Sequence, residues 1–266
     1  MDEAYHENRA LWNQRAVAGE LYATPALDRE FENPLAVVDQ CGWLGGDVRG
    51  KRLLCLAAGG GRHSVLFASA GAVVTVVDLS PRMLELDRQV ARDRGLSIRV
   101  VESSMDCLGA LDAKGFDIVV QPVSTCYVAD IRKVYLEVAR VLKGGGVYVS
   151  QHKQPASLQA EAFPAGRGYL VTEPYARKGA LPPVRGGHLH REAGAAEFLH
   201  TWEDLIGGMC KAGFVIEDLK EPRHAKPDAA PGTPGHRAAF LPPFVKVKAR
   251  RVEEARAGGT PLWTPG

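Results

Sequence analysis

The segment KRLLCLAAGGGRHSVLFASAGAVVTVVDLS, from Lys51 to Ser80, decides how this chain folds. An apolar run of strand length, Leu53 to Leu56, is followed by five small residues, Ala57 to Gly61. The pattern then predicts a helix and a second buried strand over 73–77 that ends at Asp78. This order of strand, glycine turn, helix and strand is typical of one half of a nucleotide-binding α/β fold.

The turn and the acid are suited to a nucleotide for separate reasons. Glycine lets the backbone approach a ligand closely, and the helix that starts after the turn presents free N–H groups. A carboxylate about 20 residues past the first glycine, at the end of the neighbouring strand, can accept hydrogen bonds from two ribose hydroxyls. The separation of Gly59 and Asp78 fits this spacing.

The spacing of the glycines separates two classes of cofactor. A dinucleotide fingerprint starting at Gly59 requires glycine at position 64, where the chain has Ser64. The register Cys55-x-Ala57-x-Gly59-x-Gly61 instead resembles the class I S-adenosylmethionine-dependent methyltransferases, which carry an acid and then glycines at every second position. The two later glycines match, whereas Cys55 replaces the acid that helps to organise the glycine loop and Ala57 replaces the first glycine.

The resemblance implies S-adenosyl-L-methionine as the cofactor and a set of residues that bind it. Ser104 falls at the position where this family contacts adenine, and Asp106 takes that role if the register slips by two. The implied cofactor residues are Ala57, Ala58, Gly59, Gly61, Asp78, Leu79, Met83, Ser104, Met105 and Gln121.

The rest of the chain continues the alternation of strands and helices. Strands are expected over 98–101, 116–120, 147–149, 214–219 and 240–249, and helices over 10–20, 31–44, 81–94, 130–142 and 201–212. Like the resembling family, the chain is therefore expected to form an α/β, Rossmann-like three-layer sandwich with a seven-stranded, mostly parallel sheet whose last strand is antiparallel. Valines at 245 and 247 alternate with lysines at 246 and 248, a pattern that favours an exposed edge for this last strand.

Two segments stand apart from this regular pattern. Residues 1–50 are expected to form a helical lid segment before the cofactor-binding domain at 51–266, as in the resembling family. Residues 153–199 lose regular periodicity and are rich in proline and glycine, so we expect an insertion that shapes the substrate site. The segment 225–237 is expected to be a loop.

Candidates for the chemistry follow from these positions. His152 comes directly after a central strand and is the expected general base if the acceptor must lose a proton, and Tyr127 lies in the loop after the preceding strand. These two residues are the catalytic candidates. The substrate-binding candidates are Trp12, Tyr22, His188, His190 and Arg191. No metal is expected, because the histidines lack an acid at ligand spacing.

Composition restricts the partners. The net charge is +2 with 24% charged residues, which demands neither nucleic acid nor an anionic membrane surface as a partner. Five scattered cysteines, none in C-x-x-C spacing, and the lack of a spanning apolar run predict a cytoplasmic protein with reduced thiols. We expect a monomer or homodimer acting on a small molecule, at nitrogen or oxygen and less readily at carbon. Two alternatives stay open: a non-catalytic S-adenosylmethionine-binding regulator or assembly partner, and a nicotinamide oxidoreductase.

Overall fold

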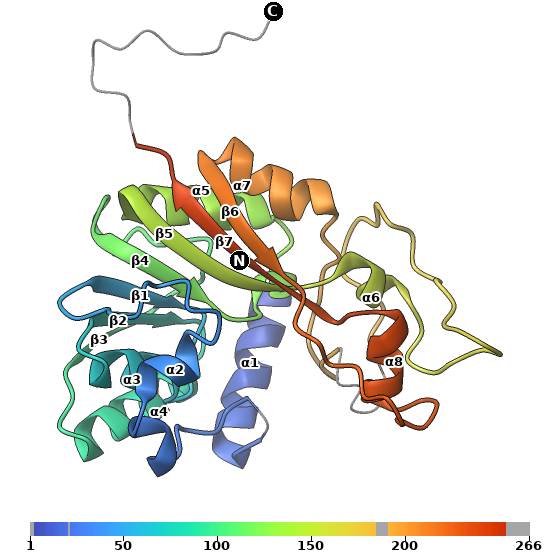
Figure 1. The fold of residues 1–266 in the computed structure, drawn as a ribbon, viewed down its shortest axis with the longest axis horizontal. Helices are drawn as coiled ribbons and strands as arrows, with labels where there is room; N and C mark the ends of the chain where they lie inside the picture. Colours follow the sequence, from blue (N-terminus) through green and yellow to red (C-terminus); the bar gives the residue numbers. More distant parts are fainter. Residues whose placement is uncertain (1–2, 21, 185–190, 254–266) are drawn as a thin grey trace, which may run out of the picture.

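The computed structural model describes residues 3–20, 22–184 and 191–253, which form one twisted sheet with helices on both faces (Figure 1). The sheet has seven strands in the order β3-β2-β1-β4-β5-β7-β6, and β7 runs antiparallel to both of its neighbours. The strands are β1 (Arg52–Leu56), β2 (Val73–Asp78), β3 (Ile98–Glu102), β4 (Phe116–Gln121), β5 (Leu142–Lys153), β6 (Phe214–Lys220) and β7 (Phe244–Arg251). This confirms the predicted Rossmann-like fold with its antiparallel last strand.

The central strand β1 is buried because helices cover both of its faces. Leu54 and Leu56 belong to a core cluster that includes residues of α5 (Ile131–Val141). Leu53 and Cys55 belong to a second cluster that includes residues of α3 (His63–Ser69). A strand covered in this way has no polar face, which explains its unbroken apolar run.

The helices divide between the two faces of the sheet (Figure 1). α2 (Pro34–Val38), α3 and α4 (Pro81–Asp93) lie on one side, and α5 and α7 (Gly208–Lys211) on the other. α1 (Glu3–Ala18) packs against α4. The short helices α6 (Pro155–Gln159) and α8 (Pro234–Phe240) lie beyond the end of β5. None of the helices within the described ranges combines the length and apolarity needed to span a bilayer.

The predicted start of α4 is confirmed by its cap. The Ser80 hydroxyl accepts a hydrogen bond from the Met83 N–H at 3.1 Å, and Pro81 occupies the first helical position. Ser80 satisfies one free N–H group of the first turn, and Pro81 has no N–H to satisfy. The end of β2 is therefore fixed relative to the helix that follows.

Three expectations about secondary structure are wrong. β7 lies between β5 and β6 instead of at an edge, because the alternation of valine and lysine reflects one buried and one partly exposed face and does not limit how many strands pair with it. Residues 234–240, expected as loop and strand, form α8, which Thr233 caps by accepting from the His236 N–H. The expected helix over 31–44 is reduced to a 3-10 turn (Asp28–Phe31) and α2, since Pro34 prevents continuation from the first into the second.

The strand β5 is also longer than expected. It starts at Leu142, and the glycines at 144–146, which separate the expected helix over 130–142 from the expected strand over 147–149, lie within it. At these glycines the pairing with β4 shifts in register. Residues up to Lys153 continue to pair with β7, so the strand extends past the level at which its neighbour β4 ends.

The two segments expected to shape the site approach each other in space. The side chain of Asn8, on α1, is buried and hydrogen-bonds the backbone of Ala196 in both directions, at 3.0 and 2.9 Å. Its amide also donates to the carbonyl of Tyr127 at 3.2 Å. α1 is therefore attached to the end of the 153–199 segment. The lid and insertion hypotheses both require such a contact, and both stay predictions.

Candidate functional site

A large cavity opens where the parallel strands end, with a volume of about 1250 Å³. Most of the predicted cofactor residues line it: Ala57, Ala58, Gly59, Asp78, Leu79, Met83, Ser104, Met105 and Gln121. Among the catalytic and substrate candidates, Trp12, Tyr22 and Tyr127 line it as well. The structure therefore brings together residues from 12 to 127, whereas Gly61 is not part of the cavity lining.

The glycine turn is packed so tightly that side chains would not fit. A Cβ atom on Gly59 would lie 2.8 Å from the Cβ of Met83 and 2.9 Å from the Cγ of Asp78. Gly60 and Gly61 have φ angles of +115° and +73°, which glycine adopts readily, and Ala57 adopts the left-handed region with φ +48°. The turn thus places bare backbone against the cavity, at the cost of strain at Ala57.

Asp78 joins the end of β2 to this turn. Its carboxylate accepts a hydrogen bond from the Gly59 N–H and another from the Ser80 N–H, both at 2.9 Å. Burial raises the pKa of Asp78, and these backbone donors oppose the rise. Because each carboxylate oxygen has two lone pairs, the group keeps acceptor capacity for a ligand in the cavity.

A second carboxylate, Asp87 on α4, holds the other side of the turn and was missed from the sequence. It is fully buried and accepts from the Gly60 N–H at 2.9 Å and from the Ser64 hydroxyl. Burial raises its pKa to about 7, opposed by hydrogen bonds from Ser64 and Gly60, and the nearby charge of Asp78 adds to the rise. Asp87 also lies near the buried thiol of Cys55, whose pKa is raised by burial and by this carboxylate.

Asp87 therefore supplies from a helix the loop-organising carboxylate that the resembling family carries at the Cys55 position. A signal for it exists in the sequence. Asp87 falls on the buried face of α4 together with Met83, Leu84 and Ala91, and an acid on the apolar stripe of an amphipathic helix indicates a buried partner.

The loop after β3 forms one end of the cavity. Ser104, Met105 and Asp106 all line it, and the Ser104 hydroxyl donates to the Asp106 carboxylate. Because these two side chains form one hydrogen-bonded pair at the cavity, either of them can contact adenine, and the adenine contact stays a prediction for both.

Gln121 lines the cavity, but its side-chain amide is occupied inside the protein. Its Nε2 donates to the Ser124 hydroxyl at 2.9 Å and contacts the Met105 sulfur at 3.2 Å, and its Oε1 accepts from the Tyr148 hydroxyl. Both N–H groups of the Gln121 amide are therefore engaged within the protein.

The other end of the cavity is lined by aromatic rings and one carboxylate. The ring of Trp12 meets Tyr127 edge to face, with centroids 5.8 Å apart. Glu192 lines the cavity near Tyr127 and was not singled out from the sequence. Burial and the negative charges around it raise the pKa of Tyr127.

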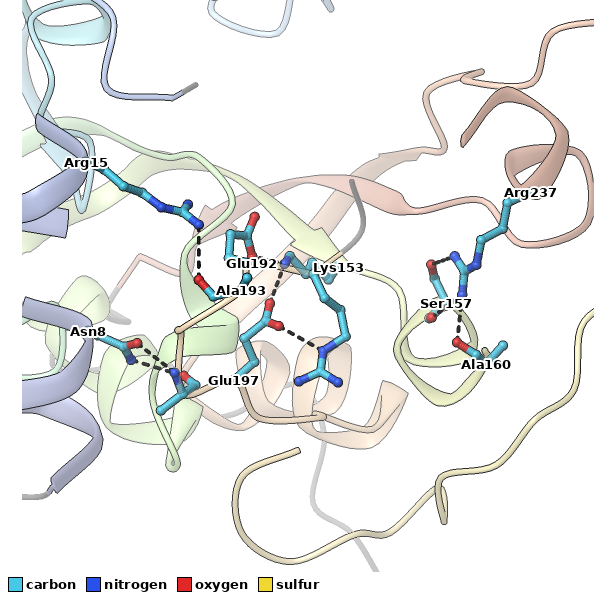
Figure 2. Close-up of polar contacts among 11 residues, drawn as sticks. Asn8, Arg15, Lys153, Ser157, Ala160, Glu192, Ala193, Glu197 and Arg237 are labelled. Carbon is cyan, nitrogen blue, oxygen red and sulfur yellow. Dashed lines mark hydrogen bonds and ion pairs between the residues drawn. The ribbon is translucent and has the colours of Figure 1, made fainter. Parts of the chain in front are cut away.

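Glu192 belongs to a buried network of charges (Figure 2). The Lys153 ammonium, on β5, forms ion pairs with Glu192 and with Glu197, and the Arg191 guanidinium pairs with Glu197 at 2.9 Å. Burial opposes ionisation of Glu192, but the positive charge of Lys153 and hydrogen bonding from neighbouring side chains together outweigh it and lower the pKa of this carboxylate. Glu192 is therefore an ionised acceptor at the cavity wall.

His152 requires a correction. Its ring is fully buried, its Nδ1 hydrogen-bonds the Thr125 hydroxyl at 2.9 Å and its Nε2 the Ser150 hydroxyl at 2.8 Å. Burial lowers its pKa to about 3, and the residue does not line the cavity. Because β5 continues through Lys153, His152 lies inside the sheet and faces the core beside Tyr135, where it has no access to a ligand in the cavity.

The remaining substrate candidates are not brought to the cavity by the described structure. Arg191 is buried in its ion pair with Glu197 and lies outside the cavity lining. His188 and His190 lie outside the described residues.

Comparison with known proteins adds independent findings. A family model described as "Methyltransferase domain" matches residues 54–150, the span from β1 into β5. A protein of Bacillus subtilis named as an uncharacterised methyltransferase, YbaJ, is 36% identical over 177 residues, which cover 65% of this chain and 69% of that protein.

Two solved structures share the fold. An S-adenosylmethionine-dependent methyltransferase from Mesorhizobium loti superposes with a TM-score of 0.62 at 24% identity, over 77% of this chain and 93% of the other. A geranyl diphosphate C-methyltransferase from Streptomyces coelicolor, solved with Mg²⁺, geranyl diphosphate and S-adenosyl-L-homocysteine, gives a TM-score of 0.62 at 15% identity, over 94% and 99% of the two chains.

Proposed function

The chain belongs to the class I S-adenosylmethionine-dependent methyltransferases, and on that premise we propose that it methylates a nitrogen or oxygen atom of a small metabolite or natural product. The chain is thus an enzyme whose cofactor is S-adenosyl-L-methionine. The observation that carries the proposal is that one cavity runs from the glycine turn to the pair formed by Tyr127 and Glu192.

The residues at the glycine turn fit this cofactor. Side-chain-free backbone at Gly59 and Gly60 admits a close ligand, and the Asp78 carboxylate at the end of β2 is placed to accept hydrogen bonds from ribose hydroxyls. Ser104, Met105 and Asp106 would surround the adenine end. When bound, S-adenosyl-L-methionine supplies a methyl group on a sulfonium, which is already activated for in-line displacement.

The size of the cavity supports a small acceptor. Pockets for drug-sized ligands span about 300–1,000 Å³. A cavity of about 1250 Å³ therefore has room for the cofactor and a second small molecule. Trp12 and Tyr22 line this space and are proposed to cover the acceptor and exclude water. Holding two reactants in line can contribute about 7–11 kcal/mol to the barrier reduction.

Tyr127 and Glu192 are proposed as the groups that face the acceptor atom. An acceptor N–H or O–H must lose its proton when the nitrogen or oxygen gains a methyl group. Glu192, kept ionised by Lys153, can receive that proton at a carboxylate oxygen, and Tyr127 lines the cavity near it.

The experiment is a screen for S-adenosyl-L-homocysteine formed from S-adenosyl-L-methionine and a mixture of amines, phenols and hydroxylated metabolites, read by mass spectrometry. With a responsive acceptor, Glu192→Gln should lower turnover by about 10²–10⁴-fold, the usual range for losing a general base. Its affinity for S-adenosyl-L-homocysteine should stay within about twofold of that of the unmodified enzyme, because Glu192 lies at the acceptor end.

Glu203→Gln serves as the matched control, since Glu203 pairs with Lys211 on the surface at 2.9 Å. Equal turnover by Glu192→Gln and Glu203→Gln would remove Glu192 from the chemistry. Turnover restricted to carbon acceptors would contradict the choice of nitrogen or oxygen.

A further inference from the structure

One wall of the cavity carries the ammonium of Lys246, which forms no ion pair with any acid in the described part of the chain. We call it the basic lobe. It is formed by Trp43, His63, Gln151, His224, Phe244 and Lys246.

Lys246 differs from the two cations that follow it on β7. Lys248 and Arg250, on the same face of the strand, both pair with Glu217 of β6, with 3.0 Å between Lys248 Nζ and a Glu217 oxygen. Lys246, nearest the cavity, makes no ion pair or side-chain hydrogen bond within the ranges that the structure describes, although it is half-buried. A half-buried ammonium without a counter-charge is unfavourable in the free protein.

The neighbours of Lys246 in the sheet add to this excess of charge. Its register partner on β6 is Lys220, and on β5 it is Gln151. Like charges directly opposite one another destabilise a strand pair. The Lys220 ammonium lies 5.4 Å from the centre of the Trp43 ring, so an aromatic face, and no carboxylate, receives this charge.

The acids on this side of the sheet accept hydrogen bonds from groups other than Lys246. Asp39 accepts from the backbone N–H groups of Trp43 and Leu44 at 2.9 and 2.8 Å. Asp218 accepts from the Trp43 indole N–H at 2.8 Å, and Glu221 accepts from the Gln154 amide. These hydrogen bonds fix the loop that carries Trp43, and none of the three carboxylates forms an ion pair with Lys246 in the described residues.

The two histidines of the lobe are suited to donate hydrogen bonds. Burial lowers the pKa of His63 to about 4, and the positive charges of Arg62 and Lys246 contribute to this lowering, so its ring is neutral and carries one N–H. His224 packs edge to face on Phe244, with ring centroids 5.4 Å apart. The His63 ring and the Gln151 amide offer neutral donors beside the Lys246 ammonium, and His224 lines the same cavity.

We propose that the basic lobe binds an oxyanion of the methyl acceptor, a carboxylate or a phosphate, with Lys246 as its counter-charge. The proposal rests on the proposed function, since it names the class of acceptor for the same cavity. The rings of Trp43 and Phe244 line the lobe beside this cation, so the body of the acceptor next to its oxyanion is apolar or aromatic. The acceptor is therefore an organic acid that also carries a methylatable nitrogen or oxygen.

The test compares charged and neutral probes of one shape. Benzoate and benzamide, and separately phenyl phosphate and phenol, are titrated into the full chain saturated with S-adenosyl-L-homocysteine and followed by ligand-observed NMR. We expect the anion of at least one pair to bind about tenfold more tightly than its neutral partner. The better pair identifies the oxyanion. Lys246→Met should abolish this preference, Lys246→Arg should restore part of it, and Lys248→Met, a control on the same strand face, should leave it intact.

Three results would overturn the proposal: equal binding of anionic and neutral probes, a preference that survives Lys246→Met, or a loss of S-adenosyl-L-homocysteine affinity in Lys246→Met with no effect on the probes. The last result would assign Lys246 to the cofactor's own carboxylate. Because the readout is binding of a probe, it separates this proposal from the proposed function. Turnover of neutral acceptors without anion binding contradicts only the basic lobe, whereas anion binding without any turnover contradicts only the methyl transfer.

Discussion

The two ends of the cavity are formed by different kinds of protein groups. The cofactor end consists of backbone and short side chains from one continuous stretch, β1 to the loop after β3, held by the carboxylates of Asp78 and Asp87. The acceptor end consists of long side chains from distant parts of the chain, including Trp12, Tyr127 and Glu192. The difference indicates that the cofactor end is set by local chain geometry, and the acceptor end by tertiary packing and buried charge.

The largest expected effect concerns Lys153, which holds the acceptor end together. Lys153→Met leaves Glu192 without its cation and Glu197 with Arg191 alone, and removing one partner of a buried ion pair costs about 3–5 kcal/mol. Urea unfolding should report a loss of this size. Lys143→Met is the matched control, because Lys143 pairs with Asp117 at the surface and such pairs are worth about 1 kcal/mol or less. Equal losses in the two variants would show that the network does not stabilise the fold.

The next effect concerns the cofactor end and depends on pH. The pKa of Asp87 is raised in the folded protein to about 7 from an ordinary value of 3.8, so the folded state binds a proton more tightly than the unfolded state does. This group therefore adds stability at low pH, which is lost as the pH rises from about 4 to about 7. Asp87→Asn should flatten that part of the stability curve, measured by urea unfolding at several pH values.

Asp93→Asn is the control for this experiment, because Asp93 lies on the exposed part of α4 and accepts hydrogen bonds from the Gln89 side chain there. If the stability of Asp87→Asn still fell between these pH values as it does in the unmodified protein, the group that takes up the proton would not be Asp87.

The smallest effect tests the strain in the glycine turn. Ala57 has a φ of +48°, a region that glycine enters without the steric cost of a Cβ. Ala57→Gly should therefore raise the free energy of unfolding by about 0.5–1 kcal/mol, whereas Ala58→Gly, at a position without positive φ, should lower it by about as much. Thermal unfolding of both variants checks the difference in sign.

The same contrast explains what the sequence could predict. The apolar runs of β1 and β2, the glycines between them and the Ser80-Pro81 helix start are local signals. Together they predict Asp78 at the end of β2 beside the glycine turn, and Asp78 lines the cavity there. The seven-stranded sheet with an antiparallel last strand was implied by the family that this order of elements resembles, and the structure confirms it.

The parts that failed depend on contacts between distant residues. His152 was expected at the end of a strand, but pairing with β7 prolongs β5 and turns this ring into the core. Glu192 gave no signal, because its role arises only when Lys153 and Tyr127, 39 and 65 positions away, meet it in space. β7 was expected at an edge, because the alternation of valine and lysine describes two unlike faces and does not tell how many neighbours a strand has.

The central claim is that the two ends act separately, with S-adenosyl-L-methionine held at Asp78 and the acceptor held at Glu192. Calorimetric titration of S-adenosyl-L-homocysteine into the unmodified chain, Asp78→Ala and Glu192→Gln tests it directly. We predict one site in the unmodified chain, about 10–100-fold weaker binding in Asp78→Ala from the loss of hydrogen bonds to a charged group, and unchanged binding in Glu192→Gln. Binding in Asp78→Ala as tight as in the unmodified chain, or an equal loss in both variants, would contradict it.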